Sequence, residues 1–143
     1  MRTPKLFAQI LMVWATLSSQ VGSAQQTPVE KLVRSYYSGF EKKDWSLMEQ
    51  ILADGFTFSS PIDDHINLKL FKERCWPNAY KIKKCEIEQL VVNGDFAFVI
   101  YNGWTTDDKL FRNSDYFKIK DGKISAYECF FGPGINYPNN TAK

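Results

Sequence analysis

The sequence predicts an α+β domain in which an antiparallel sheet packs on three N-terminal helices. Three observations lead to this prediction. Apolar residues recur at helical spacing from residue 28 to about residue 43, and two shorter helical stretches follow before residue 77. From residue 85 onward, alternating apolar and polar residues are separated by glycine-containing turns. Helices first and strands later along one chain are typical of the α+β class.

The first 24 residues have the pattern of a secretory signal peptide. Arg2 and Lys5 precede an apolar run from Leu6 to Leu17, and the segment ends in small residues at Ala24. The run is shorter than the roughly 20 apolar residues that span a bilayer. An uncleaved signal anchor is the alternative interpretation. We therefore expect a secreted or periplasmic protein without a membrane partner after cleavage.

Cleavage would leave residues 25–134 as the domain and residues 135–143 as a flexible tail. The signal contains two of the 18 basic residues and none of the 16 acidic ones, so the mature chain would have no formal net charge. Nucleic-acid binding depends on a basic surface that neutralises phosphates. We therefore expect no nucleic-acid partner.

Capping residues mark the start of each expected helix. Thr27, Pro28 and Glu30 form a capping box with proline in the first turn, followed by a helix of about four turns. Asp44 can cap a second, short helix, and Asn67 can cap a third.

Glycine and proline residues should end these helices and delimit the strands. Asp54-Gly55 should break the second helix, and Pro77 should stop the third. The polar segment from Pro61 to His65 is expected to be a loop. The expected strands are Phe56–Ser60, Cys85–Val92, Phe96–Thr106, Leu110–Lys120 and Lys123–Phe131.

The strand segment from Phe96 to Tyr101 is apolar on both faces. A sheet with one face on helices has its other face free, so this pattern suggests that the outer face is also covered. We expect a homodimer formed through the outer sheet face.

Several local patterns in this order resemble the SnoaL-like branch of the NTF2-like superfamily, over about residues 29–132. They are the first amphipathic helix, Phe58-Ser59-Ser60-Pro61 with Asp63-Asp64, Cys75-Trp76-Pro77, Phe111-Arg112-Asn113-Ser114-Asp115, and Asp121-Gly122-Lys123-Ile124 leading to Glu128 and Phe131-Gly132. The resemblance implies a cone-shaped, strongly curved sheet with a pocket at one end. Members of this superfamily include ketosteroid isomerase, polyketide cyclases, dehydratases and domains that only bind ligands, so the fold alone does not decide the function.

The chain departs from the enzymes of that superfamily at two positions. Ser60 precedes Pro61 where ketosteroid isomerase has an aspartate, and a serine cannot replace that proton-abstracting carboxylate. Cyclases and dehydratases often use a His–Asp combination in the cone, but here the only histidine is His65, in the expected loop.

Strand alternation identifies Asp115 and Glu128 as candidate catalytic residues. Asp115 shares a face with Phe117 and Ile119, which marks that face as inward. If Glu128 also points inward, two carboxylates in an apolar pocket would raise one pKa and supply an acid or base near neutral pH. The alternative is that both hold structure, with Asp115 accepting hydrogen bonds and Glu128 pairing with Arg74 or a lysine.

The aromatic content suggests a pocket for a small apolar or aromatic molecule. Three cysteines permit one disulfide, whose pairing stays open; the alternative is that they are small buried apolar residues without a bridge. The sequence has no CxxC motif and only one histidine, so it carries no metal or cofactor signature. An aromatic-lined binding domain is therefore the first hypothesis, an isomerase, cyclase or dehydratase using Asp115 or Glu128 the second, and a structural dimerisation module the third. The candidate ligand-binding residues are Tyr36, Phe58, Asp63, His65, Trp76, Tyr101, Asn113 and Phe130.

Overall fold

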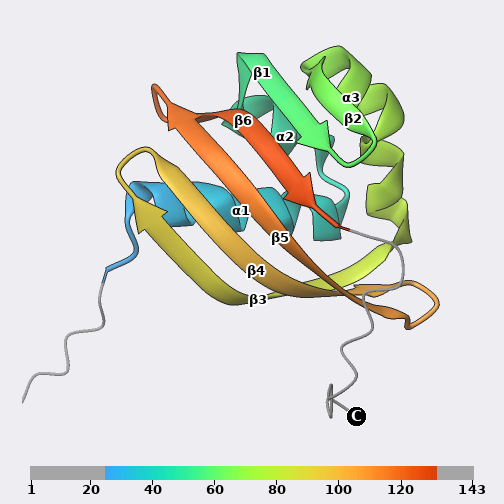
Figure 1. Cartoon of the computed structure of the whole chain (residues 1–143). Coiled ribbons are helices and arrows are strands. Elements are labelled where there is room, and N and C mark those ends of the chain that lie inside the picture. The colour runs from blue at the N-terminus through green and yellow to red at the C-terminus, as the bar shows by residue number, and fades with distance from the viewer. Residues whose placement is uncertain (1–24, 132–143) are drawn as a thin grey trace, which may run out of the picture.

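The computed structural model describes residues 25–131, and over this range three α-helices and one 3-10 helix pack on a six-stranded sheet (Figure 1). The expected signal peptide and the expected tail lie outside the described residues. Within the described range, no helix has both the length and the hydropathy to cross a membrane.

The three α-helices begin where their capping residues predict, and they are α1 (Pro28–Lys42), α2 (Trp45–Ile51) and α3 (Leu68–Arg74). A 3-10 helix, η1 (Trp76–Lys81), follows α3 without a side-chain cap. Thr27 and Glu30 form the expected capping box, and Asp44 and Asn67 cap α2 and α3. Pro77 follows the end of α3 but lies in the first turn of η1, where a missing N–H leaves no hydrogen bond unmade.

The strands form one mixed sheet with the order β2-β1-β6-β5-β4-β3. Every neighbouring pair is antiparallel except β1 and β6, which run parallel. This arrangement confirms the α+β prediction with a curved sheet and adds one parallel pair to it. The strands are β1 (Leu52–Ser60), β2 (Asp63–Asn67), β3 (Ile82–Asn93), β4 (Phe96–Thr105), β5 (Leu110–Lys120) and β6 (Lys123–Phe130).

Two expectations about the first strand are wrong. Asp54-Gly55 does not separate α2 from the first strand, because α2 ends at Ile51 and β1 starts at Leu52 and continues through this pair. The segment expected to be a loop contains β2, which forms a hairpin with β1. The Ser60 hydroxyl accepts hydrogen bonds from the backbone N–H groups of Ile62 and Asp63, which holds the tight turn between the strands.

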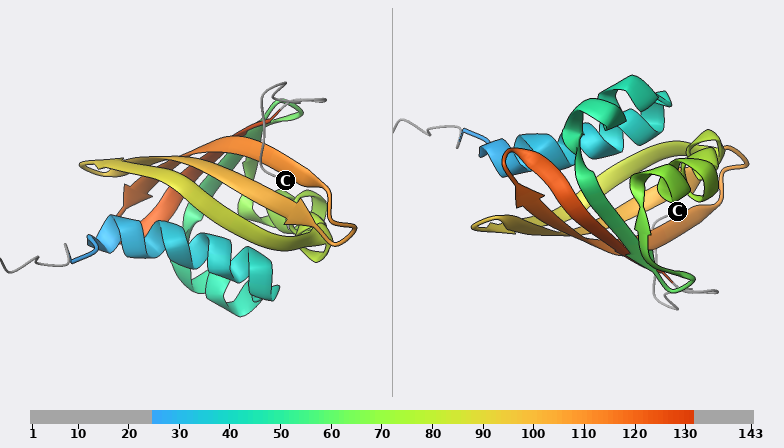
Figure 2. Two further views of the ribbon diagram at one scale, coloured as in Figure 1. Left: turned by 90° about the horizontal axis from the view of Figure 1, so that it is seen from below. Right: turned by 90° about the horizontal axis from the view of Figure 1, so that it is seen from above.

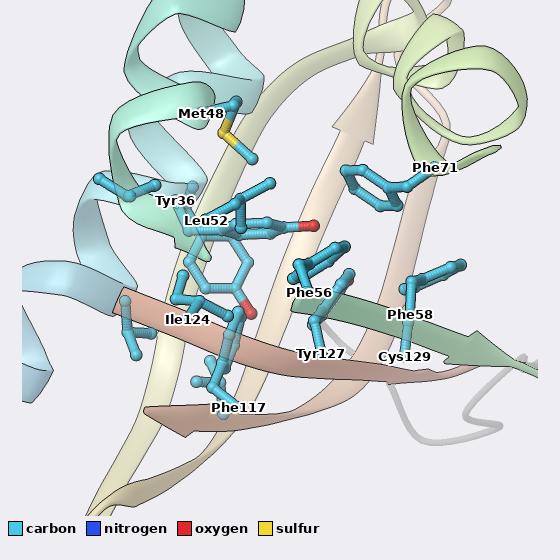
Figure 3. Close-up of a cluster of buried hydrophobic side chains, with 14 of the residues drawn as sticks. Tyr36, Met48, Leu52, Phe56, Phe58, Phe71, Phe117, Ile124, Tyr127 and Cys129 are labelled. Carbon is cyan, nitrogen blue, oxygen red and sulfur yellow. The ribbon is translucent and has the colours of Figure 1, made fainter. Parts of the chain in front are cut away.

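The helices cover one face of the sheet, and the core lies between the helices and this face. Figure 2 shows α1 and α2 on the same side of the twisted strands. Tyr36 of α1 packs against Phe117 of β5 and Tyr127 of β6, with ring centroids 5.2 and 4.8 Å away. Phe117 and Tyr127 are themselves stacked at 4.9 Å (Figure 3). This group of rings fixes α1 on the middle of the sheet.

The outer face of the sheet carries an aromatic cluster of its own. Phe98 lies 6.1 Å from Phe96 and 5.1 Å from Tyr116, centroid to centroid, and is 48% exposed. An exposed apolar group of this kind is consistent with the expected homodimer. The homodimer stays a prediction. Light scattering of the purified protein tests it, and the mass of a monomer would contradict it.

Gly103 of β4 allows one wall of the interior to form, because the Phe111 ring lies directly over it. A Cβ atom at this position would overlap that ring. We expect Gly103→Ala to lower the free energy of unfolding by about 1–3 kcal/mol, the usual cost of overpacking. Urea denaturation measures this loss.

Gly55→Ala is the matched control, because no atom lies within 4 Å of a Cβ built there. Equal unfolding free energies for the two variants would contradict the assignment of Gly103 as a close-contact position.

Candidate functional site

A cavity of about 210 Å³ opens at one end of the fold, between the β1–β2 turn and η1. Its mouth is the exposed end, where Ile62 is 75% exposed and the Arg74 side chain is half-exposed. Its volume is below the roughly 300–1,000 Å³ of typical ligand pockets. The aromatic residues that form most of the wall are Tyr36, Tyr37, Phe40, Phe58, Phe71, Tyr101, Phe111 and Tyr127.

Asp115 lies beneath the floor of this cavity and is fully buried. Its Oδ2 atom accepts hydrogen bonds from the hydroxyls of Tyr37, at 2.6 Å, and Tyr127, at 3.1 Å. Its Oδ1 atom has no hydrogen-bond partner among the described residues. Tyr37 and Tyr127 line the cavity, whereas Asp115 does not, so the two tyrosines separate the carboxyl group from a ligand.

Burial determines the protonation of this group. It raises the pKa of Asp115 to about 7, although hydrogen bonds from Tyr37, Cys129 and Tyr127 oppose the rise. Burial and the nearby Asp115 carboxylate raise the pKa values of Tyr37 and Tyr127 well above the usual range, so both phenols keep their protons. Asp115 therefore changes its charge near neutral pH while the tyrosines around it stay neutral.

A second polar pair lies on the wall beside this floor. The Asn113 side-chain amide donates a hydrogen bond of 3.1 Å to the Tyr101 hydroxyl. This hydrogen bond fixes the position of the phenol group on the wall, and the hydroxyl also contacts the Cys129 thiol. The Tyr36 hydroxyl is also buried at the cavity, and its pKa is raised by burial and by Asp115.

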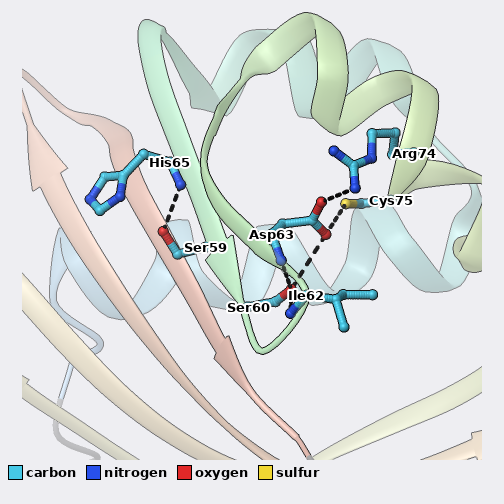
Figure 4. A network of polar contacts seen from close by, with 7 residues as sticks. All are labelled: Ser59, Ser60, Ile62, Asp63, His65, Arg74 and Cys75. Atoms are coloured by element: carbon cyan, nitrogen blue, oxygen red, sulfur yellow. Dashed lines mark hydrogen bonds and ion pairs between the residues drawn. The ribbon is translucent and has the colours of Figure 1, made fainter.

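The mouth carries an ion pair between Asp63 of β2 and Arg74 of α3 (Figure 4). The Arg74 guanidinium lies 2.6 Å from Asp63 Oδ1, and the Cys75 thiol lies 3.8 Å from Oδ2. The Asp63 backbone N–H donates to Ser60. The buried charge of Asp63 is thus offset by a half-exposed arginine, and the mouth is close to neutral.

Cys75, Cys85 and Cys129 all line the cavity and are free thiols in the described structure. Burial raises the pKa of Cys75 and of Cys85 to about 12, and it raises that of Cys129 further. At neutral pH they are apolar lining groups and not thiolate nucleophiles.

The structure brings five of the predicted ligand-binding residues to this cavity. Their role in binding stays a prediction, but all five contribute to its lining: Tyr36, Phe58, Asp63, Tyr101 and Asn113.

The expectation that Asp115 and Glu128 share a cavity is wrong. Asp115 pairs in register with Cys129, whereas Glu128 pairs with Tyr116 on the outer face. The cause is an irregularity in β6: Lys118 pairs with Ala126 but Ile119 pairs with Ile124, which leaves Ser125 as an extra residue. Such a bulge reverses the alternation of every residue beyond it.

The same bulge overturns the expectation for Phe130, which lies on the outer face and is 51% exposed. Two other candidates also lie away from the cavity. The His65 side chain is exposed beside Asp64, and its backbone N–H donates to Ser59 (Figure 4). Trp76 is buried in the core, where its ring lies 5.0 Å from Phe40 and 5.1 Å from Trp45.

The sequence interpretation missed the two tyrosines that hold Asp115. Tyr37 follows Tyr36 in α1, and helical spacing alone assigns both to the core. Tyr127 precedes Glu128, which was considered for the inner face, and the bulge places Tyr127 on that face instead. Arg74 was considered as a partner of Glu128 but pairs with Asp63.

The buried carboxyl group makes the stability of the protein depend on pH. The Asp115 carboxyl ionises near pH 3.8 when unfolded and near pH 7 when folded, so the folded state holds an extra proton between these values. Its contribution to stability is therefore complete below pH 3.8 and is lost as the pH rises to 7. We expect this loss to be about 4 kcal/mol.

Asp115→Asn removes the titration but keeps an acceptor for the tyrosines. The difference in unfolding free energy between wild type and variant, measured by denaturant titration across this pH interval, should shift against the wild type as the pH rises. A constant difference would show that Asp115 is ionised throughout.

A sequence profile of the SnoaL-like domain matches residues 33–127. No curated protein matches the chain. Solved structures with a similar fold include an NTF2-like protein of unknown function from Cytophaga hutchinsonii, which is 20% identical with a TM-score of 0.61, over 77% of this chain and 95% of that one.

Two further similar structures come from proteins described as enzymes. A candidate polyketide cyclase from Sinorhizobium meliloti is 22% identical with a TM-score of 0.60, over 69% of this chain and 93% of that one. An epoxide hydrolase from M. tuberculosis is 12% identical with a TM-score of 0.62, over 73% and 83%. At these identities the similarity concerns the fold. Because the profile matches most of the described residues, the chain belongs to the SnoaL-like family.

Proposed function

We propose that this protein binds a small, mostly apolar ligand in the cavity at the open end of the fold. The observation that carries the proposal is the cavity lining, which is largely aromatic but contains hydroxyl groups on one side and an ion pair at the mouth. Pockets of this composition bind through apolar contact and use a few polar groups for orientation.

The volume of the cavity limits the size of the ligand. At about 210 Å³ it suits a single ring or a short chain better than a molecule of several fused rings. The Phe111 ring above Gly103 closes one side, so the space cannot extend in that direction without a shift of this ring.

Acid–base catalysis by a pair of carboxylates has less support. Glu128 lies on the outer face, and the hydroxyls of Tyr37 and Tyr127 separate Asp115 from the cavity. A general acid or base must come within hydrogen-bond distance of the reacting proton. Proteins of similar fold that are described as a candidate cyclase and an epoxide hydrolase indicate that this fold is compatible with catalysis, but the geometry here favours binding.

The test is mass spectrometry of the gently purified protein, under conditions that retain bound small molecules. We expect the wild type to carry a ligand and Asn113→Phe to lose it, because the new ring would occupy the cavity that Asn113 lines.

Ser114→Phe is the matched control. Ser114 is the next residue of β5 and points to the outer face, so this variant should retain the ligand. A wild type without ligand, or equal retention by the two variants, would contradict the proposal.

We also propose that this binding takes place outside the cytoplasm. The proposal rests on the charged start, short apolar run and small-residue end of residues 1–24. N-terminal sequencing of the protein made in its own cells should give a mature chain that begins at Gln25. An intact Met1 would contradict cleavage.

A further inference from the structure

Asp115 is a fully buried carboxylate without a cationic partner. Within residues 25–131 no lysine, arginine or histidine forms an ion pair with it. Its Oδ1 atom has no hydrogen-bond partner in that range either. Buried charges in proteins are normally paired or coordinated, because desolvation of an isolated charge is costly. The fold can hold Asp115 as a neutral acid, but once Asp115 ionises it lacks the counter-charge that a buried carboxylate normally has.

The hydrogen bonds to Asp115 also determine what the cavity floor presents to a ligand. Tyr37 and Tyr127 both direct their hydroxyl protons to Oδ2. A phenol that donates its single proton has only lone pairs left, so these two side chains offer acceptors to the cavity that they line. The complementary group on a ligand is a hydrogen-bond donor.

The electrostatic surroundings point to a positively charged donor. At the mouth, Asp63 and Arg74 offset each other at 2.6 Å, so Asp115 is the charge near the cavity that lacks a counter-charge. The rings of Tyr36 and Tyr101 line the same space, and the faces of aromatic rings attract cations.

We propose that the ligand is a small organic ammonium ion with an apolar body, whose N–H groups donate to the hydroxyl oxygens of Tyr37 and Tyr127 above the Asp115 carboxylate. This inference rests on the proposed function and specifies the ligand class for the same cavity. The aromatic wall holds the apolar body, and the volume of about 210 Å³ suits one ring with a short aminoalkyl group.

Binding of an ammonium ion should depend on the ionisation of Asp115. The titratable groups that face it are Tyr36 and Tyr37 of α1, Cys85 of β3, Tyr101 of β4, and Tyr127 and Cys129 of β6. Burial raises the pKa of each, so all six are neutral near pH 7 and Asp115 is the member of the group that changes charge. A cation favours the ionised form, and we expect its affinity to increase as the pH rises through 7.

Isothermal titration calorimetry with three probes tests the inference on the mature chain. The probes share a phenyl ring and a short chain: 2-phenylethylamine, 2-phenylethanol and 3-phenylpropanoate. We expect the amine to bind about tenfold more tightly than the alcohol at about pH 8, and the carboxylate to bind most weakly. The advantage of the amine should decrease at about pH 6, where Asp115 is protonated.

Variants connect this preference to the named groups. Asp115→Asn should bind the amine and the alcohol with similar affinity. Tyr37→Phe removes one acceptor and keeps the carboxylate, so it should weaken binding of the amine more than binding of the alcohol. This variant provides a second test if Asp115→Asn does not fold. Glu128→Gln removes a carboxylate from the outer face of the neighbouring strand and should keep the wild-type preference.

Several results would overturn the inference. They are equal affinity for the amine and the alcohol in the wild type, and retention of the preference for the amine in Asp115→Asn. A loss of this preference in Glu128→Gln as large as in Asp115→Asn, or no binding of any probe, would overturn it as well. The proposed function is decided separately by ligand retention in Asn113→Phe and Ser114→Phe. A co-purified neutral ligand would support the proposed function and contradict the ammonium inference.

Discussion

The hydrogen bonds from Tyr37 and Tyr127 to Asp115 join three elements that are far apart in the sequence. Tyr37 comes from α1, Asp115 from β5 and Tyr127 from β6. Because all three groups are buried, losing one donor would leave the Asp115 carboxyl group with a single tyrosine partner in an apolar interior. The network therefore constrains the position of α1 on the sheet, and with it the position of the cavity floor. The stacked rings of Tyr36, Phe117 and Tyr127 act in the same place through apolar contact.

The helices could be predicted from the sequence because the signals that define them are local. The capping box at Thr27 and the caps at Asp44 and Asn67 involve residues only three positions apart, and all three form as expected. The site depends instead on register between strands, which no local pattern reports. A single extra residue at Ser125 was enough to place Tyr127 and Cys129 on the inner face in place of Glu128 and Phe130.

The mouth was predicted incompletely for a related reason. Asp63 was a candidate ligand-binding residue and lines the cavity, but the segment that contains it was expected to be a loop. The Ser60 hydroxyl turns the chain within two residues, so β2 pairs with β1 and brings Asp63 beneath Arg74 of α3. His65 points away because it lies on this same short strand with a positive φ of 47°. A turn held by a serine side chain is difficult to distinguish from a loop without knowledge of its strand partner.

A carboxyl group in this position can be used in two ways, and the orientation of its neighbours distinguishes them. In a proton-transfer site the carboxyl group must reach the reacting atom, and its hydrogen-bond partners must leave one face open toward the substrate. Here the phenol groups of Tyr37 and Tyr127 lie between Asp115 and the cavity, and burial keeps both phenols protonated. The negative charge can therefore act on a ligand through the tyrosine oxygens without exchanging a proton with it. Recognition of a ligand needs only this electrostatic effect, so the geometry is better suited to binding than to proton transfer.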